Sequence, residues 1–332
     1  MAQSVEVSVL IPLYNEAETI AALYQQVTEV MQPSGRSFEI LFVDDGSTDA
    51  GPAILANLAA KDPRLVVIRL RRNFGKAVAL DTGFRQARGR VVVTLDADLQ
   101  DDPTEIPRLL AALERGYQLV NGHKQIRHDP WHKVWPSRLF NGLVRLLTGI
   151  PFWDFNCGLK AYSAEVTRRL HLYGELHRFI PVLVHAMGFA MVEMPVRHHP
   201  RRHGRSKYGP ARLYKGFFDL LTILLTTRFA TRPLHLFGGV GLGLGAAGLL
   251  ILGYLTLLWF HGSGPIGTRP LLFLGMLLLM VGVQLVGVGL LGELLLHTRA
   301  TNAFPYAIES IQRDGSGAEP PVCDRLDERH RG

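Results

Sequence analysis

The chain of 332 residues contains little cysteine, with only Cys157 and Cys323 far apart and without the spacing of metal ligands. Two such residues exclude the disulfide framework of a small secreted protein and indicate a reducing compartment. The first residues also lack the basic region and long apolar run of a secretory signal peptide, because residues 4–8 alternate like a strand. We therefore expect the globular part to remain in the cytoplasm.

Charged residues are absent from residues 233–268, and acidic residues are absent from residues 197–215, which hold seven Lys and Arg. Residues 234–260 and 271–291 each reach the roughly 20 apolar residues that a spanning helix needs. Basic residues precede the first span, whereas the turn between the spans holds only Arg269. The positive-inside rule therefore predicts that both termini face the cytoplasm.

No glycine-rich phosphate loop of the GxGxxG or Walker type follows the first predicted strand, so a nucleotide would have to be bound in another way. Apolar periodicity nonetheless predicts alternating strands and helices. The predicted strands are 5–13, 38–44, 65–70, 89–95 and 118–122, and the predicted helices are 17–31, 48–60, 75–87, 107–116 and 135–147. This alternation predicts an α/β fold with a mostly parallel sheet that binds ligands at the carboxyl ends of its strands.

Acidic residues gather at these predicted strand ends, with Asp44 and Asp45 after the second strand and further acids after the fourth. Residues two apart on a strand face the same side, so Asp96, Asp98 and Gln100 can converge on one point. Such oxygen ligands suit a hard cation, Mg²⁺ or Mn²⁺, bound together with substrate phosphates. Carboxylates after a strand also serve as helix caps and turns, so this pattern alone leaves the metal site open.

Four tracts in order resemble the family-two inverting glycosyltransferases of the GT-A fold, and more narrowly the polyprenyl-phosphate glycosyltransferases of the dolichol-phosphate mannose synthase group. The tracts are residues 12–16, 44–49, 73–76 and 96–98. The resemblance implies a GT-A nucleotide-sugar-binding domain followed by interfacial helices and two transmembrane helices. It implies nucleotide contacts by Pro12, Tyr14, Glu16, Asp44 and Asp45, and binding of Mg²⁺ or Mn²⁺ by Asp96, Asp98 and Gln100.

The basic stretch 124–133 is too irregular for a core element and by itself is typical of a solvated loop. It also resembles the mobile loop that closes over the donor and acceptor phosphates in this family. The resemblance implies phosphate binding by Lys124 and Arg127. Lysine stands at 124 where the family more often has arginine, and the two side chains bind phosphate differently.

Asp154 lies among three aromatic residues, where a carboxylate is costly unless it has a partner or a function. A capping aspartate bonded to the backbone near Gly158 is the alternative. The family places its catalytic aspartate in this tract, so the resemblance implies Asp98, Asp154 and Arg127 as the catalytic set. Cys157 has no histidine placed to activate it, so we interpret it as a packing residue.

Residues 201–208 resemble the family signature Arg-x-x-Gly-x-Ser-Lys-Tyr that precedes the membrane segments. The resemblance implies that Arg202, Arg205 and Lys207 bind phosphate. A juxtamembrane basic cluster also fixes topology and attracts lipid headgroups, so both roles stay open.

The sequence therefore predicts four regions: a cytoplasmic GT-A domain (1–211), an interfacial helical segment (212–232), a transmembrane hairpin (233–298) and a largely disordered cytoplasmic tail (299–332). The expected protein lies in a bacterial inner membrane. Its expected partners are a UDP- or GDP-sugar, a polyprenyl phosphate and the membrane, but not nucleic acid, because no aromatic-interleaved basic strip occurs. Whether it forms a homo-oligomer through the glycines of 238–248 stays open.

The resemblance implies transfer of a sugar, with inversion, to a polyprenyl phosphate of the undecaprenyl or dolichyl type, for a cell-envelope glycan or lipid modification. One alternative is a glycosyltransferase acting directly on another lipid or on a polysaccharide. The Gln-x-x-Arg-Trp tract of processive synthases is not found in the chain. A non-catalytic membrane scaffold is the other alternative, and it would need the acidic and basic groups only as structure.

Overall fold

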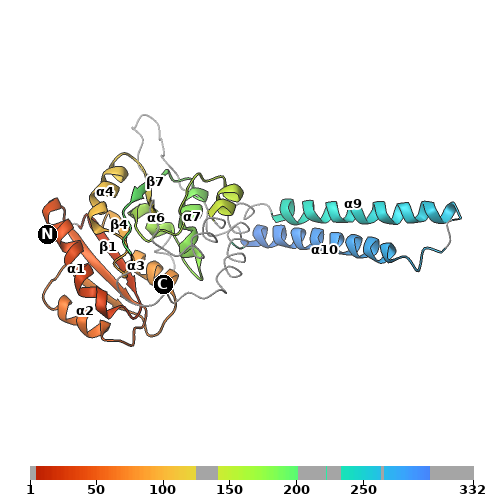
Figure 1. Ribbon diagram of the computed structural model, residues 1–332. Helices are drawn as coiled ribbons and strands as arrows, with labels where there is room; N and C mark the ends of the chain where they lie inside the picture. Colours follow the sequence, from red (N-terminus) through yellow and green to blue (C-terminus); the bar gives the residue numbers. More distant parts are fainter. Residues whose placement is uncertain (1–4, 125–140, 201–221, 223–232, 263–264, 300–332) are drawn as a thin grey trace. The chain divides into compact units, whose positions relative to one another are not determined.

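The computed structural model describes residues 5–124, 141–200, 222, 233–262 and 265–299. These residues belong to two compact units, one that contains the sheet and one that contains two long helices. Figure 1 shows the elements of each unit.

The strands of the described residues form one seven-stranded sheet in the order β3-β2-β1-β4-β6-β5-β7. They are β1 (Val7–Leu13), β2 (Phe38–Asp44), β3 (Leu65–Arg69), β4 (Val91–Thr94), β5 (Leu119–Lys124), β6 (Lys160–Ser163) and β7 (Met191–Val196). Strand β1 is parallel to β2 and β4, β2 is parallel to β3, and β5 is parallel to β7. Only β6 runs antiparallel to its neighbours, β4 and β5. The predicted mostly parallel sheet is confirmed, whereas β6 and β7 were not predicted.

Strands β1 and β2 are buried along their whole lengths, which is typical of parallel strands covered on both faces. The polar side chains that these two strands bury form hydrogen bonds and ion pairs. Ser8 donates a hydrogen bond of 2.6 Å to Glu39 Oε1, and Arg88 Nη2 lies 2.7 Å from Glu39 Oε2. These contacts compensate the cost of burying a carboxylate in the sheet.

The helices pack on the sheet through apolar faces. They are α1 (Ala17–Met31), α2 (Gly51–Ala59), α3 (Lys76–Gln86), α4 (Ile106–Glu114), α6 (Ala164–Arg169) and α7 (Ile180–Ala186), and residues 141–148 are also helical. Helix α1 buries Ile20, Leu23 and Val27, at the spacing of one helix face. Helix α3 lies close to β1 at Gly83, where an added Cβ would lie 2.2 Å from Leu10 Cδ1. These helices confirm the predicted helices 17–31, 48–60, 75–87 and 107–116 as α1 to α4. Residues 141–147 of the predicted helix 135–147 are also helical, and its first residues lie outside the described ones.

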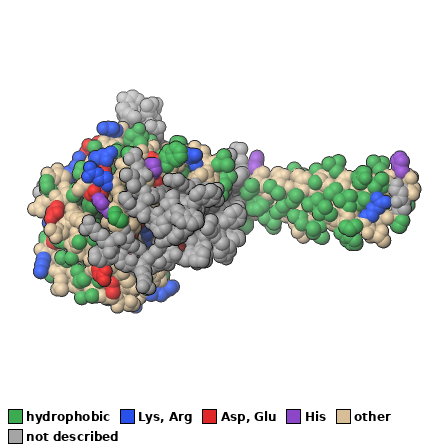
Figure 2. All heavy atoms as spheres, in the orientation of Figure 1, with side chains coloured by type: hydrophobic (Ala, Val, Ile, Leu, Met, Phe, Trp, Pro, Cys, Tyr) green, Lys and Arg blue, Asp and Glu red, His purple; other side chains and the backbone are tan. Residues whose placement is uncertain are grey.

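The second unit is a hairpin of α9 (Pro233–Phe260) and α10 (Pro270–Arg299), which lie side by side. By length and composition, Pro233–Phe260 and Pro270–Leu295 are candidate membrane spans. Figure 2 shows hydrophobic side chains over much of the visible face of the hairpin. Both predicted spans therefore lie in helices of the expected length.

The glycines of α9 fall on two different faces. A Cβ at Gly241 would lie 2.6 Å from the Gly282 carbonyl oxygen, and a Cβ at Gly248 would lie 2.7 Å from the Gly275 carbonyl oxygen. At Gly239 and Gly243 nothing described lies within 4 Å of that position. The close contact expected of the glycine-rich face therefore occurs within the hairpin, through Gly241 and Gly248.

We expect Gly241→Ala to loosen the hairpin, because the new methyl group would overlap the backbone of α10. Overpacking of this kind costs about 1–3 kcal/mol, and the loss is measurable as a lower midpoint of thermal unfolding in detergent. Gly243→Ala is the matched control, and it should be neutral or slightly stabilising because alanine favours helix. Equal midpoints for the two variants would contradict the packing described here.

Candidate active site

The site lies at the carboxyl ends of β1, β2 and β4, which are parallel neighbours. Leu13 at the end of β1 is in register with Asp44, and Leu10 is in register with Thr94 at the end of β4. The segments that follow these three strands therefore meet at one edge of the sheet, as the α/β prediction requires.

The two aspartates at the end of β2 are buried and hold neighbouring loops. Asp45 accepts hydrogen bonds from the backbone N–H of Phe74 (2.7 Å) and of Gly75 (2.8 Å). Asp44 accepts one from Ser47 N (2.8 Å), and its other oxygen lies 3.4 Å from Arg69 Nε. Both carboxylates thus lie at the predicted edge, where they shape the loops that border a ligand site.

The first tract is joined to the second by hydrogen bonds around Asn15, which has a left-handed backbone (φ 52°). Asn15 N donates to Ser47 Oγ at 2.9 Å, and Asn15 Oδ1 accepts from Thr48 N at 2.8 Å. Tyr14 and Glu16 lie half-buried on either side of Asn15, and Pro12 is buried within β1. The structure thus brings these three predicted nucleotide contacts next to the Asp44–Asp45 segment.

The acidic residues after β4 lie in a turn rather than on the strand, because β4 ends at Thr94. The prediction that strand alternation aligns Asp96, Asp98 and Gln100 was therefore wrong. Leu99 between the last two has φ 58°, a conformation that costs free energy for a residue with a side chain. Gln100 Nε2 donates to the His199 carbonyl oxygen at 3.4 Å, which turns this side chain toward the segment after β7.

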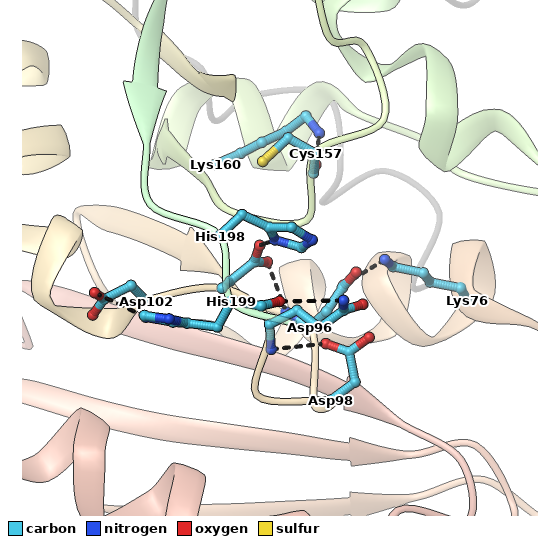
Figure 3. Close-up of polar contacts among 10 residues, drawn as sticks. Lys76, Asp96, Asp98, Asp102, Cys157, Lys160, His198 and His199 are labelled. Atoms are coloured by element: carbon cyan, nitrogen blue, oxygen red, sulfur yellow. Dashed lines mark hydrogen bonds and ion pairs between the residues drawn. The ribbon is translucent and has the colours of Figure 1, made fainter. Parts of the chain in front are cut away.

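Asp96 and Asp98 lie next to each other in this turn, as Figure 3 shows. Asp96 forms an ion pair with Lys76 at the start of α3, and Asp98 Oδ1 accepts a hydrogen bond of 3.2 Å from Gln100 N. Burial opposes the charge on Asp96, but the ammonium groups of Lys76 and Lys124 outweigh it and lower its pKa to about 2. Asp96 is therefore a carboxylate at neutral pH.

Two histidines after β7 bind that segment to the acidic turn (residues 96–102), an arrangement that the sequence did not predict (Figure 3). His198 forms an antiparallel bridge with Asp101, and His199 N donates to the Gln100 carbonyl oxygen at 2.8 Å. His198 Nδ1 lies 3.6 Å from Asp101 Oδ1, and His199 Nε2 lies 3.3 Å from Asp102 Oδ2. The residues that lead into the basic cluster are thus attached directly to the turn that carries Asp98.

Of the predicted phosphate-binding residues, only Lys124 is described. It ends β5, and although burial opposes its charge, the carboxylates of Asp101, Asp154 and Asp96 raise the pKa of Lys124. Its ammonium group therefore belongs to the same charge cluster as the acidic turn. The other predicted phosphate ligands, Arg127, Arg202, Arg205 and Lys207, lie outside the described residues.

Asp154 is 3% exposed and is held by two strands of the sheet. Its backbone N–H donates to Glu193 Oε1 on β7 at 2.8 Å, and its carbonyl oxygen accepts from Asn121 Nδ2 on β5 at 2.7 Å. Its carboxylate accepts a hydrogen bond from Asn156 N at 3.2 Å, a local contact of the kind that the capping alternative expects. The catalytic role of Asp154 stays a prediction.

Gly158 brings the Asp154 tract against the acidic turn. A Cβ at Gly158 would lie 2.5 Å from Asp96 Cγ and 2.7 Å from Asp101 Oδ2, so a larger residue here would have to displace these two carboxylates. Thr94 Oγ1 donates to the Gly158 carbonyl oxygen at 2.8 Å and fixes the loop there. The Asp154 tract, the acidic turn and the end of β4 therefore form one site.

Relatives of known activity match the chain over most of its length. Dodecaprenyl-phosphate galacturonate synthase of Rhizobium johnstonii is 39% identical over 95% of this chain and 96% of its own. Undecaprenyl-phosphate 4-deoxy-4-formamido-L-arabinose transferase of Edwardsiella ictaluri is 40% identical over 86% of this chain and 87% of its own. Residues 8–172 match the family described as Glycosyl transferase family 2. The chain belongs to this family and is a glycosyltransferase, so the resemblance stated from the sequence is confirmed.

Solved structures show the same fold. Glucosyl-3-phosphoglycerate synthase from Mycobacterium tuberculosis, crystallised with Mn²⁺, UDP-glucose and glycerol 3-phosphate, matches with a TM-score of 0.51 and 22% identity over 67% of this chain and 80% of that chain. The complex of that enzyme with Mn²⁺, UDP and phosphoglyceric acid matches with a TM-score of 0.52 and 21% identity. The sheet and its helices are therefore of the GT-A type, as the sequence predicted.

Cys157 should not react with thiol reagents in the folded protein, because it is 2% exposed and burial raises the pKa of its thiol to about 12. At pH 7.5 its thiolate fraction is then on the order of 10⁻⁴ or less. We expect no labelling of a Cys323→Ser variant by iodoacetamide at pH 7.5, and one label per chain after denaturation, measured by mass spectrometry. Rapid labelling in the native state, with loss of transfer activity, would contradict the interpretation of Cys157 as a packing residue.

Proposed function

We propose that this chain transfers a sugar from a nucleotide-sugar donor to a membrane polyprenyl phosphate, with inversion at the anomeric carbon. The observation that carries the proposal is the joint presence of the GT-A site and two candidate membrane spans in one chain. The relatives named above are similar across both parts, and their names specify dodecaprenyl and undecaprenyl phosphate. The product would be a polyprenyl-phosphate sugar for a cell-envelope glycan or lipid modification.

The acidic turn fits a divalent cation only if the donor supplies part of its coordination. Among the described residues no group of three or more His, Cys, Asp or Glu side chains is arranged to hold a metal ion. Asp96 and Asp98 offer two adjacent carboxylates, and Mg²⁺ or Mn²⁺ commonly combines one or two carboxylates with substrate phosphates. Asp98 and Asp96 would therefore hold the ion on the diphosphate, where it would neutralise charge on the departing nucleoside diphosphate.

The acceptor needs little activation, because a phosphomonoester with a second pKa of about 6 is largely ionised at neutral pH. Asp154, fixed by Glu193 and Asn121, would orient the acceptor or the sugar rather than act as an essential base. Lys124 would offset the negative charge of the substrate phosphates beside Asp154. The other predicted phosphate ligands, Arg127, Arg202, Arg205 and Lys207, would do the same. Direct in-line attack then inverts the anomeric centre.

Glycosyl transfer to another lipid or to a polysaccharide is the competing reaction, and a non-catalytic scaffold is the other alternative. An assay with radiolabelled UDP- and GDP-sugars and undecaprenyl phosphate separates them. One sugar per lipid, recovered in the organic phase, supports the proposal. A long water-soluble product would indicate a polysaccharide synthase, and no turnover with any donor would favour the scaffold.

We expect Asp98→Asn to remove most of the transfer activity while the protein stays folded and inserted in membranes. The cause would be weaker cation and diphosphate binding, so the stabilisation of the protein by Mn²⁺ plus UDP or GDP in a thermal shift experiment should also shrink. Glu114→Gln, an exposed carboxylate at the end of α4, is the matched control. Full activity of Asp98→Asn in membranes treated with EDTA would refute the metal role.

The orientation in the membrane is proposed from the distribution of basic residues. Residues 197–215 contain seven Lys and Arg residues. Residues 261–269, between the two helices, contain one, Arg269. The positive-inside rule then places the GT-A unit and both termini in the cytoplasm of a bacterial inner membrane, with residues 261–269 outside.

Cysteine labelling tests this orientation. In a Cys323→Ser background, a Thr268→Cys variant should react with an impermeant maleimide added to intact spheroplasts. A Ser34→Cys variant, whose site is exposed on the GT-A unit, should react only after lysis. The reverse pattern would overturn the proposed topology.

A further inference from the structure

A small cavity lies directly behind Asp96, at the edge of the sheet where the Asp154 tract meets the acidic turn. Pro12 of β1, Thr94 of β4 and Lys160 of β6 line it, together with Lys76 and with His177 of the short 3-10 helix Leu176–Phe179. The cavity therefore adjoins the groups that we propose hold the donor diphosphate. Its volume is little more than a water molecule needs, so at most a small substituent of a substrate fits it, and not a sugar ring.

Lys160 brings a buried positive charge to this cavity. The residue is 3% exposed, and its ammonium group donates a hydrogen bond to the Cys157 carbonyl oxygen. An ammonium group has three N–H donors. Among the described residues, the Cys157 carbonyl oxygen is the one acceptor that the Lys160 ammonium group contacts. Burial lowers the pKa of Lys160 even though the carboxylates of Asp154 and Asp96 favour its charged form, so these neighbours do not fully replace the water that it lost. A buried cation with so few partners indicates that an acceptor is supplied from outside the chain.

His177 lines the same cavity, and one of its ring nitrogens lacks a partner within the described part of the chain. Its Nδ1 atom is buried and has no hydrogen-bond partner among the described residues. Burial and the nearby Lys76 ammonium keep the pKa of His177 well below its usual value, so the imidazole is neutral. A neutral imidazole can donate a hydrogen bond to an oxygen without adding a second charge.

The charge of the cavity favours an anion. The ion pair with Asp96 compensates Lys76, and the Cys157 thiol is neutral because burial raises its pKa to about 12. Lys160 is then the remaining cation of the lining, and the carboxylates of Asp154 and Asp96 lie near enough to favour its charged form. A carboxylate group suits this cavity because it is small, carries a negative charge and has two oxygens that accept hydrogen bonds.

We propose that the cavity of Lys160 and His177 binds a carboxylate of the donor sugar, which makes the donor a nucleotide-linked uronic acid. The inference rests on the proposed function, because it places the sugar next to the diphosphate held at Asp96 and Asp98. Lys160 then selects the donor through its charge, and His177 contributes a neutral hydrogen bond. A donor with a hydroxymethyl group at the same position would leave the buried ammonium without its anion.

Matched donors that differ in one substituent test the proposal. UDP-glucuronate is compared with UDP-glucose, and UDP-galacturonate with UDP-galactose, with GDP-linked pairs added if GDP rather than UDP binds. The wild-type chain should prefer the acid by at least about tenfold in kcat/KM. Lys160→Met should lower kcat/KM for the acid by about 10- to 100-fold, the loss expected for a charge-assisted hydrogen bond, and leave the neutral donor within about threefold.

Binding measured without lipid acceptor keeps the test independent of turnover. Lys160→Met should weaken binding of the acid donor but not of the nucleoside diphosphate alone, which also shows that the variant is folded. His177→Leu, which removes only the neutral hydrogen bond, should cost the acid donor less than Lys160→Met does. Lys61→Met, an exposed lysine after α2, is the control and should change neither donor.

Three results would overturn the proposal: equal use of the acid and neutral donors by the wild type, an equal loss for both donors in Lys160→Met, or a loss confined to KM for the lipid. The last result would assign Lys160 to the acceptor phosphate. The first result, with a neutral donor transferred to undecaprenyl phosphate as well as the acid, would leave the proposed function intact. Absence of lipid product with every donor would instead refute the proposed function.

Discussion

The structure depends on a balance of charge at one edge of the sheet, because parallel strands bring carboxylates together that would otherwise repel one another. Asp96, Asp101 and Asp154 lie close enough to shift the pKa of Lys124, and the Lys76 ammonium holds Asp96 ionised. Each of these lysines belongs to a different element, so the charges balance only when the sheet is complete. In the proposed function the same balance would let the region accept a highly charged donor, because a divalent cation bound together with a diphosphate would add little net charge.

The fold of the first 124 residues could be predicted because its signals are local. Buried β-rich runs such as β1 and β2 and the periodic face of α1 each carry their own pattern. Strand β6 carries no such pattern, since its four residues begin with a buried lysine, and its place between β4 and β5 is fixed by pairing across the sheet. The antiparallel insertion is thus a long-range property, which periodicity in a single sequence does not report.

The site was predicted in position but not in detail. The sequence places Asp44, Asp45, Asp96 and Asp98 at strand ends, yet the left-handed Leu99 and the end of β4 at Thr94 depend on the turn itself. The contacts of His198 and His199 join residues about a hundred positions apart, so no local motif announces them. Lys160 was overlooked for a similar reason, because its burial follows from the neighbours of β6 rather than from the residues around it in sequence.

The bridge between Asp101 and His198 has a consequence for the order in which the chain becomes functional during synthesis. The strands that carry the aspartates leave the ribosome early, but the loop held by Gly158 and the histidine bridge require residues up to 199. Loop closure over such a distance cannot precede translation of its second end. The nascent chain therefore completes this edge of the sheet only after residue 199 has been made, and Pro233, where the first candidate membrane span begins, follows 34 residues later.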